Sequence, residues 1–199
     1  MAQQAILERD RWQPSVIEGR RVRLRRHQPE NLARVLRWYR DPELARLTRY
    51  QLRPMTREEV ERFFQSRLLG PDSVAYAIHE APSDRLIGLT TLSALDAENG
   101  SALFHITIGE RDAWGRGFGT EATELMLEHA FERLGLHRIG LAVFAFNDRA
   151  MRSYEKAGFT IEGRSRDAIL RDGRYWDEVQ MGVLAQEWLA RPRPARSKR

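Results

Sequence analysis

One segment constrains the fold of this chain more than any other, the glycine-rich run WGRGFGTEA from Trp114 to Ala122. It follows a predicted strand and opens a predicted helix. Glycines at such a junction permit a tight turn and let backbone N–H groups approach a ligand closely. The helix N-terminus adds the positive end of a dipole, so the junction suits a phosphate or pyrophosphate. The Arg116 side chain would add a charge contact to that anion.

The same run is also compatible with a simple strand-to-helix turn that needs small residues. It is not a P-loop, because no Gly-Lys-Ser/Thr ending is present. A dinucleotide-binding fingerprint would need a third glycine at the position that Thr120 occupies. The glycines alone therefore indicate an anion-binding turn or a structural turn.

A second segment, NDRAMRSYEKAGF from Asn147 to Phe159, predicts a short helix after a buried strand. Ala150, Met151 and Tyr154 share one helical face. A tyrosine on an apolar face is usually a core residue, but its hydroxyl is a proton donor if it reaches a site. Asn147, at the strand end, would place its amide toward the same cleft.

Hydrophobic periodicity and turn signals order the remaining elements. Thr56 and Glu59 predict a capping box at a helix start, Asn147 or Asp148 predicts a second helix cap, and Asp41-Pro42 and Gly158 predict helix ends. The predicted elements are a strand at 21–25, helices at 29–40 and 56–69, strands at 74–79, 86–95 and 102–108, a helix at 120–134, a strand at 139–146, a helix at 148–157, and two strands within 159–184 joined at Asp172-Gly173. Hairpins early and late, with a βαβ crossover between them, indicate a mixed α/β domain.

Composition excludes several other classes of protein. The 199 residues are enough for one domain with a real core, and they include no cysteine. Disulfides, thiolate zinc sites and a cysteine nucleophile are therefore absent. No apolar run reaches the roughly 18 residues of a membrane span, and no signal peptide is recognisable, so a cytoplasmic protein without a membrane partner is expected.

Positive charge is concentrated at the C-terminus. The whole chain has 33 Lys and Arg against 28 Asp and Glu, and five of the positive residues lie in the last nine, RPRPARSKR. Without those five, the charges of the body balance. Residues 191–199 are thus a basic tail, for which a solvated terminus is favoured over a nucleic-acid tether.

Together these motifs resemble the GNAT superfamily of acyl-CoA-dependent N-acyltransferases, and most closely its RimJ/RimL-like branch, over about residues 18–187. A third motif of that branch is present as DGRYW from Asp172, followed by VQMGVL from Val179. The resemblance implies an N-terminal extension at 1–17, one acetyltransferase domain at 18–190 and the tail at 191–199.

The implied fold is an α/β (α+β) sandwich. A mixed, mostly antiparallel seven-stranded sheet is flanked by helices, and its fourth and fifth strands, at 102–109 and 138–146, splay apart. The implied cosubstrate is acetyl-CoA, whose pantetheine arm would enter between those strands and bond to backbone near Ile108.

The resemblance also implies roles for individual residues. The pyrophosphate would lie on the loop of Trp114 and Gly115, bound by the amides of Arg116, Gly117, Gly119 and Thr120. Asn147 would contact the pantetheine. Tyr154 would protonate the departing thiolate, and the Ile108 N–H would stabilise the oxyanion.

The general base that deprotonates the amine is left open between Glu110 and His105, acting directly or through water. His105 alternates with Leu103 and Thr107 in a predicted strand, and either face is compatible with that pattern. The other histidines have no metal-ligand spacing, so no metal site is expected.

The acceptor is the least constrained feature. By resemblance to the branch, we expect a protein or peptide α-amine, attacked in a ternary complex. A small-molecule amine (an amino acid, antibiotic or polyamine) and a non-catalytic acyl-CoA-binding domain are the alternatives. Five arginines near the expected acceptor mouth would favour an anionic acceptor or form a solvated face: Arg37, Arg40, Arg46, Arg49 and Arg53. Homodimers are common in the family, and the sequence leaves the oligomeric state open.

Overall fold

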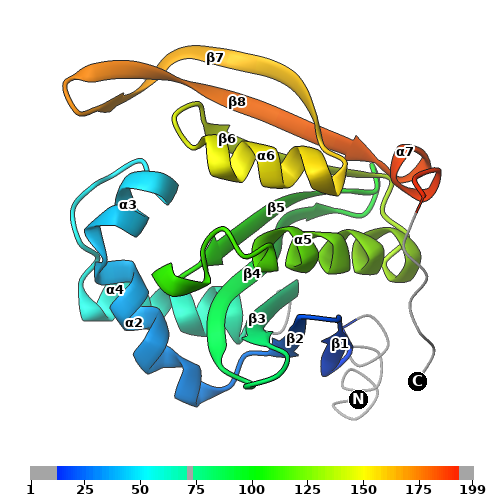
Figure 1. Ribbon diagram of the computed structural model, residues 1–199, viewed down its shortest axis with the longest axis horizontal. Helices are drawn as coiled ribbons and strands as arrows, with labels where there is room; N and C mark the ends of the chain where they lie inside the picture. Colours follow the sequence, from blue (N-terminus) through cyan, green and yellow to red (C-terminus); the bar gives the residue numbers. More distant parts are fainter. Residues whose placement is uncertain (1–12, 71–73, 193–199) are drawn as a thin grey trace.

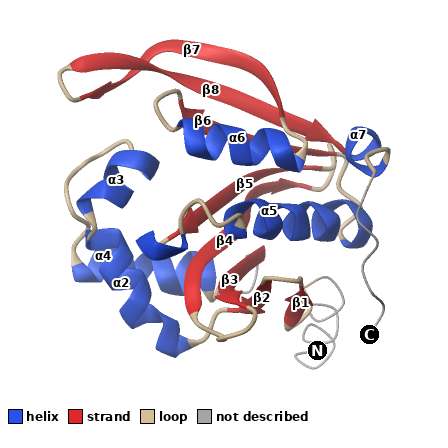
Figure 2. Ribbon diagram, in the orientation of Figure 1, coloured by secondary structure: helices blue, strands red, loops and turns tan. Residues whose placement is uncertain are grey.

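The computed structural model describes residues 13–70 and 74–192, which form one twisted sheet with helices on both faces (Figures 1 and 2). The strands are β1 (Val16–Glu18), β2 (Val22–Arg26), β3 (Val74–Glu80), β4 (Leu86–Asp96), β5 (Ser101–Ile108), β6 (Arg138–Phe144), β7 (Thr160–Arg171) and β8 (Arg174–Leu184). The α-helices are α2 (Leu32–Arg40), α3 (Pro42–Thr48), α4 (Arg57–Phe63), α5 (Phe118–Glu128), α6 (Asp148–Ala157) and α7 (Ala185–Leu189).

The strands are ordered β1-β2-β3-β4-β5-β6-β8-β7. Every neighbouring pair is antiparallel except β5 and β6, which run parallel. The predicted mixed, mostly antiparallel sheet is therefore confirmed. The number of strands differs: eight are present among the described residues, because Val16–Glu18 pairs with β2. Three residues are too few for a period-two pattern to be recognised.

Alternation along the strands divides the core between the two faces of the sheet. In β3, Tyr76 and Ile78 pack in the cluster that contains the apolar side of α5, whereas Ala75 and Ala77 pack with α2 and α4. One face thus carries α5 and α6 and the other carries α2, α3 and α4. In Figure 1, α5 and α6 lie side by side in front of the sheet.

Local signals fixed several helix ends as predicted. Thr56 and Glu59 form the capping box that starts α4. Asn147 caps α6 through its side-chain oxygen and the Ala150 N–H, and Gly158 ends that helix at φ +109°. The Asp172-Gly173 turn joins β7 and β8, with both residues at positive φ.

One helix was missed and one predicted boundary was wrong. The predicted helix end at Asp41-Pro42 is itself confirmed, because α2 ends at Arg40 with Asp41 as its C-cap. Asp41-Pro42 was interpreted as the end of a helix, but the Asp41 carboxylate also caps α3 by accepting from the Glu43 and Leu44 N–H groups. Pro42 at the first helical position is typical of a helix start, so the signal was present. Helix α5 begins at Phe118, two residues before the predicted Thr120.

Both chain ends of the described region contact the domain. The Gln13 amide donates to the Ala75 carbonyl (3.1 Å), and the Arg191 guanidinium donates to the Lys156 carbonyl at the end of α6. The remaining basic residues of the predicted tail, Arg193 to Arg199, lie outside the described residues. Within residues 13–70 and 74–192, no helix has the length and apolar character needed to cross a membrane.

Candidate active site

A V-shaped opening separates β5 from β6. The two strands pair at only three positions, Ser101 with Arg138, Ala102 with Ile139 and Leu103 with Gly140. Beyond these pairs β6 continues along β8 as far as Phe144. A cavity of about 1420 Å³ is lined by the unpaired ends of both strands. The predicted splaying of these two strands is confirmed.

The backbone of Ile108 faces this opening. The Gly109 N–H donates to the Ile87 carbonyl (2.8 Å), and Gly88 is the cross-strand partner of Ile108. Gly88 and Ile108 are therefore a pair without mutual hydrogen bonds, in which the Ile108 N–H points away from β4. That direction is toward β6, so this N–H is placed to act on a ligand between the strands.

The glycine-rich loop presents the first turn of α5 to the same cavity. Gly115 and Gly117 have φ values of +72° and +81°, which glycine adopts without strain. The first intrahelical bond runs from the Glu121 N–H to the Gly117 carbonyl (3.1 Å), so the amides before Glu121 precede the helical ladder. Gly115, Gly117, Gly119 and Thr120 all line the cavity, as an anion-binding turn requires.

Two residues that sequence reasoning missed hold this loop in place. The buried Glu121 carboxylate accepts from the Arg21 N–H (2.9 Å) and from the Arg21 guanidinium (3.1 Å). The same guanidinium donates to the Arg116 carbonyl (3.0 Å) and lies beside Gly117. A glutamate in the first turn of a helix is a recognisable N-terminal feature, but its partner is 100 residues away.

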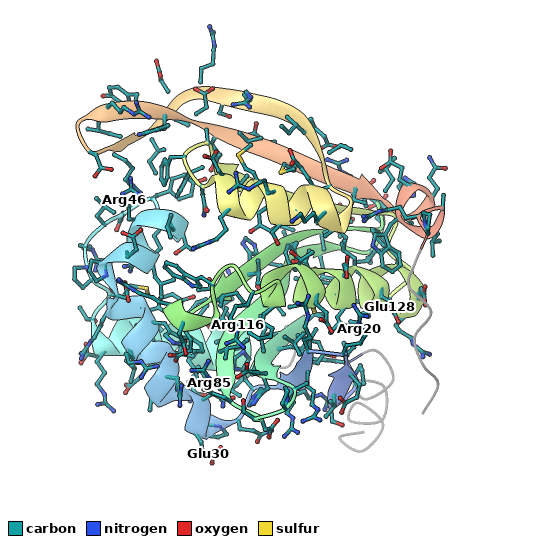
Figure 3. All side chains as sticks on the ribbon, viewed as in Figure 1. Arg20, Glu30, Arg46, Arg85, Arg116 and Glu128 are labelled. Carbon is teal, nitrogen blue, oxygen red and sulfur yellow. The ribbon has the colours of Figure 1, made fainter. Side chains whose placement is uncertain are left out.

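The side chain of Arg116 is directed away from the predicted anion. Its guanidinium pairs with Glu80 (3.0 Å) and lies 4.7 Å from the centre of the Phe118 ring. Arg116 is not among the residues that line the cavity, and Figure 3 labels it on the loop before α5. The predicted charge contact of this side chain with a bound anion stays a prediction.

Helix α6 supplies cationic groups that sequence reasoning also missed. Arg149, Arg152 and Lys156 line the cavity, at the i, i+3 and i+7 spacing that places them on one helical face. The Ser153 and Thr120 hydroxyls are 2.8 Å apart and join α6 to the start of α5. The cations therefore stand beside the free amides of the glycine-rich loop.

Trp114 and Asn147 both line the cavity, and polar atoms of both side chains already make hydrogen bonds within the protein. The Trp114 indole N–H donates to the Ile108 carbonyl (2.7 Å), and the Arg149 guanidinium stacks 4.0 Å from its ring centre. The Asn147 amide caps α6 and also donates to the Leu47 carbonyl (3.3 Å). Both side chains position neighbouring elements, and the predicted pantetheine contact of Asn147 stays a prediction.

Tyr154 projects from α6 into the cavity between two aromatic rings. Its ring lies 6.3 Å from Phe104 and 5.9 Å from Phe159, both in edge-on geometry. Burial raises the pKa of Tyr154 to about 12. The hydroxyl is therefore protonated at neutral pH and available as a donor.

The two candidate bases lie in different surroundings. One oxygen of Glu110 accepts from Arg34 (3.0 Å), from Trp38 (3.0 Å) and from Arg37. Glu110 is not among the residues that line the cavity. Its carboxylate joins the end of β5 to α2, which is a structural role.

His105 lines the cavity on the face opposite Tyr154. The buried Phe104 packs against Tyr154, so the alternation of β5 directs His105 to the face of α2 to α4. One ring nitrogen lies 2.7 Å from the Ser93 hydroxyl. Burial first, and the Arg67 charge second, lower the pKa of His105 below its ordinary value. The lowered pKa favours the neutral imidazole, which is the form that can accept a proton.

Comparison with known proteins agrees with this geometry. The model of the acetyltransferase (GNAT) domain matches residues 21–160. Spermidine N(1)-acetyltransferase of Vibrio cholerae serotype O1 is 30% identical over 134 residues, 67% of this chain and 76% of that protein. The Bacillus subtilis protein named "Putative ribosomal N-acetyltransferase YdaF" is 31% identical over 103 residues, 52% of this chain and 56% of that protein.

Solved structures of acetyltransferases also resemble this chain in fold and in sequence. A spermidine N-acetyltransferase from Vibrio cholerae in complex with CoA and spermine has a TM-score of 0.75 at 25% identity, covering 85% of this chain and 98% of that one. A dodecameric structure of spermidine N-acetyltransferase from the same organism has a TM-score of 0.70 at 25% identity, with 85% and 97% covered. The family model spans most of the domain that carries the opening between β5 and β6. This chain is therefore a member of the GNAT acetyltransferases and an N-acetyltransferase.

Proposed function

We propose that this enzyme transfers the acetyl group of acetyl-CoA to the primary amine of a small molecule, by direct attack in a ternary complex. One observation carries the proposal: a single cavity passes between β5 and β6 and joins the two faces of the sheet. Acetyl-CoA on the side of α5 and α6 and an amine on the side of α2 to α4 would meet in that opening. Holding both reactants in one cavity removes much of the entropic barrier.

The residues on the side of α5 and α6 fit the phosphate groups of CoA. The amides of Gly117, Gly119 and Thr120 supply N–H donors at a helix N-terminus. Arg149 and Arg152 add positive charge beside them. The CoA-bound structure of the Vibrio enzyme supports the same choice of cosubstrate. Acetyl-CoA supplies the thioester carbonyl that the amine attacks.

The protein's own groups would then act at three atoms. The neutral His105 accepts a proton from the ammonium, directly or through water. The Ile108 N–H donates to the oxyanion that forms when the amine adds to the carbonyl. The Tyr154 hydroxyl gives its proton to the departing sulfur, and the resulting phenolate takes up the second proton that the acetylated nitrogen releases, which restores the hydroxyl. Burial raises the pKa of Tyr154 to about 12, so the hydroxyl keeps its proton until the sulfur departs.

We assign the base to His105 rather than Glu110 because only His105 lines the cavity. Direct attack is favoured over a covalent acetyl-enzyme because the chain has no cysteine. No metal is assigned a role in this scheme.

The small-molecule acceptor replaces the peptide α-amine as our first choice. The Vibrio enzyme with a bound polyamine, which this chain covers almost completely, supports it. A peptide α-amine remains the second candidate, supported by the likeness to YdaF, which covers about half of this chain.

The test is free-thiol release from acetyl-CoA against a panel of amines: polyamines, amino acids, aminoglycosides and peptides with different N-terminal residues. We expect turnover with a small amine and loss of turnover in Tyr154→Phe with acetyl-CoA binding retained. Turnover with peptides alone would move the proposal to its second candidate. Acetyl-CoA binding without turnover on any amine would contradict it.

A further inference from the structure

The cavity has a distinct compartment on the face of α2 to α4, which we call the acceptor compartment. On β8, Val179 and Met181 pack in the core under α6, so Glu178 and Gln180 face the other way. His105 on β5 faces the same side. The compartment is lined by Arg49, Tyr50, Phe63, Ser66, Arg67, Ser93, His105, Glu178 and Gln180.

Positive charge exceeds negative charge in this compartment. Among the described residues, neither the Arg49 nor the Arg67 guanidinium has a carboxylate within salt-bridge distance. Glu178 is the one acidic residue that lines the cavity in the described part of the chain, and it already accepts from the Tyr50 hydroxyl. His105 is neutral. An anion is therefore the group that these two arginines lack.

The excess extends outward from the compartment. A second cavity of about 520 Å³ shares Arg49, Phe63, Ser66 and Arg67 with the first. It adds Arg53 and Arg62 and one carboxylate, Glu59. Glu59 is held by both nitrogens of Arg53, at 2.8 Å and 2.6 Å. Its charge is thus neutralised, and an approaching polycation meets uncompensated arginines.

Contacts from the hairpin of β7 and β8 hold the segment of chain that carries Arg49. The buried Arg171 on β7 donates to the carbonyls of Arg49 and Tyr50, the latter at 2.9 Å. Arg46 on α3 pairs with Asp172 at the tip of the hairpin (2.7 Å). These contacts hold the end of α3 against β7, so the backbone that carries the Arg49 side chain is fixed before a ligand arrives. Fixing this backbone reduces the entropic cost of ordering the site on binding.

We propose that the acceptor of this enzyme is a primary amine that also carries an anionic group, a carboxylate or a phosphate, which Arg49 and Arg67 bind while the amine faces His105 and the opening. The inference rests on the proposed function and names its substrate class. It separates this chain from a polyamine acetyltransferase, because a second ammonium on the acceptor would approach two arginines and, among the described lining residues, one carboxylate.

Matched amines test the charge alone. In the first pair, 4-aminobutyrate and 1,4-diaminobutane place a carboxylate or an ammonium at the end of chains of closely similar length. In the second, phosphoethanolamine and ethanolamine differ by the phosphate and distinguish it from a carboxylate. We expect the anionic member of at least one pair to have the higher kcat/KM, by about tenfold or more, the gain typical of one charge-assisted contact. A higher kcat/KM for 1,4-diaminobutane than for 4-aminobutyrate, together with a higher value for ethanolamine than for phosphoethanolamine, would overturn the proposal.

Variants assign the preference to the compartment. Arg67→Gln is expected to lower kcat/KM for the anionic amine about tenfold and to leave that of the matched cation unchanged or raised. Arg133→Gln is the control, since it removes one exposed charge from a site that does not line the cavity. Equal losses in both variants would overturn the assignment. Calorimetry of acetyl-CoA binding, read beside turnover, shows which proposal fails. Turnover that prefers the cationic amines contradicts this inference alone. Acetyl-CoA binding without turnover on any amine contradicts the proposed function.

Discussion

The indole nitrogen of Trp114 donates a 2.7 Å hydrogen bond to the carbonyl of Ile108, and both residues line the cavity between β5 and β6. This bond satisfies the carbonyl of the same residue whose N–H faces the opening. It also joins the glycine-rich loop to the end of β5. One side chain thereby fixes the position of two elements that acetyl-CoA would contact under the proposed function: the loop at its phosphates and Ile108 at its thioester.

Trp114→Phe is expected to loosen this arrangement without emptying the space that the ring fills. The lost hydrogen bond should lower the free energy of unfolding by about 1 kcal/mol. KM for acetyl-CoA should rise severalfold, because the loop and the Ile108 backbone are no longer held together. Denaturant melts and initial rates measure the two effects, and an unchanged KM would contradict the positioning role.

Tyr154→Phe tests the proton donor. The ring stays between Phe104 and Phe159, so the fold should be retained. Loss of a general acid is expected to lower kcat about 10²-fold or more. The dissociation constant for acetyl-CoA, measured by calorimetry, should change little. If kcat stays within twofold of the parent, another group protonates the sulfur.

The proposed role of His105 as the base predicts how kcat/KM falls on the acid side of the pH profile. Since burial and the Arg67 charge lower its pKa, kcat/KM should rise with pH through a midpoint below 6.5, the ordinary value for histidine. His105→Gln should lose most of the activity along with that limb. Glu110→Gln is the comparison: it should destabilise the contact with α2 but keep the limb. If the acid limb persists in His105→Gln, the base is Glu110 or a group that acts through water.

The lowered pKa of His27 predicts how the free energy of unfolding depends on pH. It is buried in the core beside Phe64, and burial lowers its pKa from 6.5 to about 4. Between these values the unfolded chain binds a proton that the folded chain does not, so stability is lost as pH falls. The loss attributable to His27 is about 3 kcal/mol once pH falls to about 4. Chemical denaturation of the parent and of His27→Gln at pH 7 and pH 4 measures it, and parallel losses in both proteins would contradict the assignment.

Alanine substitutions at Gly117 and Gly119 test two effects separately: backbone strain in the loop, and a side chain that occupies the cavity. Gly117→Ala forces a φ of +81° on alanine and brings its Cβ to 2.7 Å from the Arg21 guanidinium, so a loss of about 1–2 kcal/mol in stability is expected. Gly119→Ala meets its nearest atom at 3.6 Å, an ordinary contact, and should fold normally. It should nevertheless weaken acetyl-CoA binding, because its Cβ would stand at the helix N-terminus. Equal stability of the two variants would contradict the strain argument.

Sequence reasoning reached the parts of this protein that are encoded locally. The capping box of Thr56, the turn at Asp172-Gly173 and the glycine-rich loop each depend on a few adjacent residues, and all were recognised. The family resemblance added the splayed strands, which no local pattern reveals.

The parts that were missed depend on distant or competing partners. The Glu121–Arg21 contact joins residues 100 positions apart, and α3 was hidden because Asp41-Pro42 signals both an end and a start. Of the five arginines named for the acceptor mouth, Arg49 lines the cavity, whereas Arg37, Arg46 and Arg53 bind carboxylates. Arg67, which does line it, was not singled out because nothing in its local sequence distinguishes it from other helical surface arginines.

The three-pair ladder between β5 and β6 has a mechanical consequence. It is a seam that divides the sheet into a half of five strands, β1 to β5, and a half of three, β6 to β8. Few backbone hydrogen bonds cross it, so helices carry much of the connection between the halves. A ligand seated across the seam acts as a crosslink, and its binding free energy stabilises both halves against separation even though it touches only their edges.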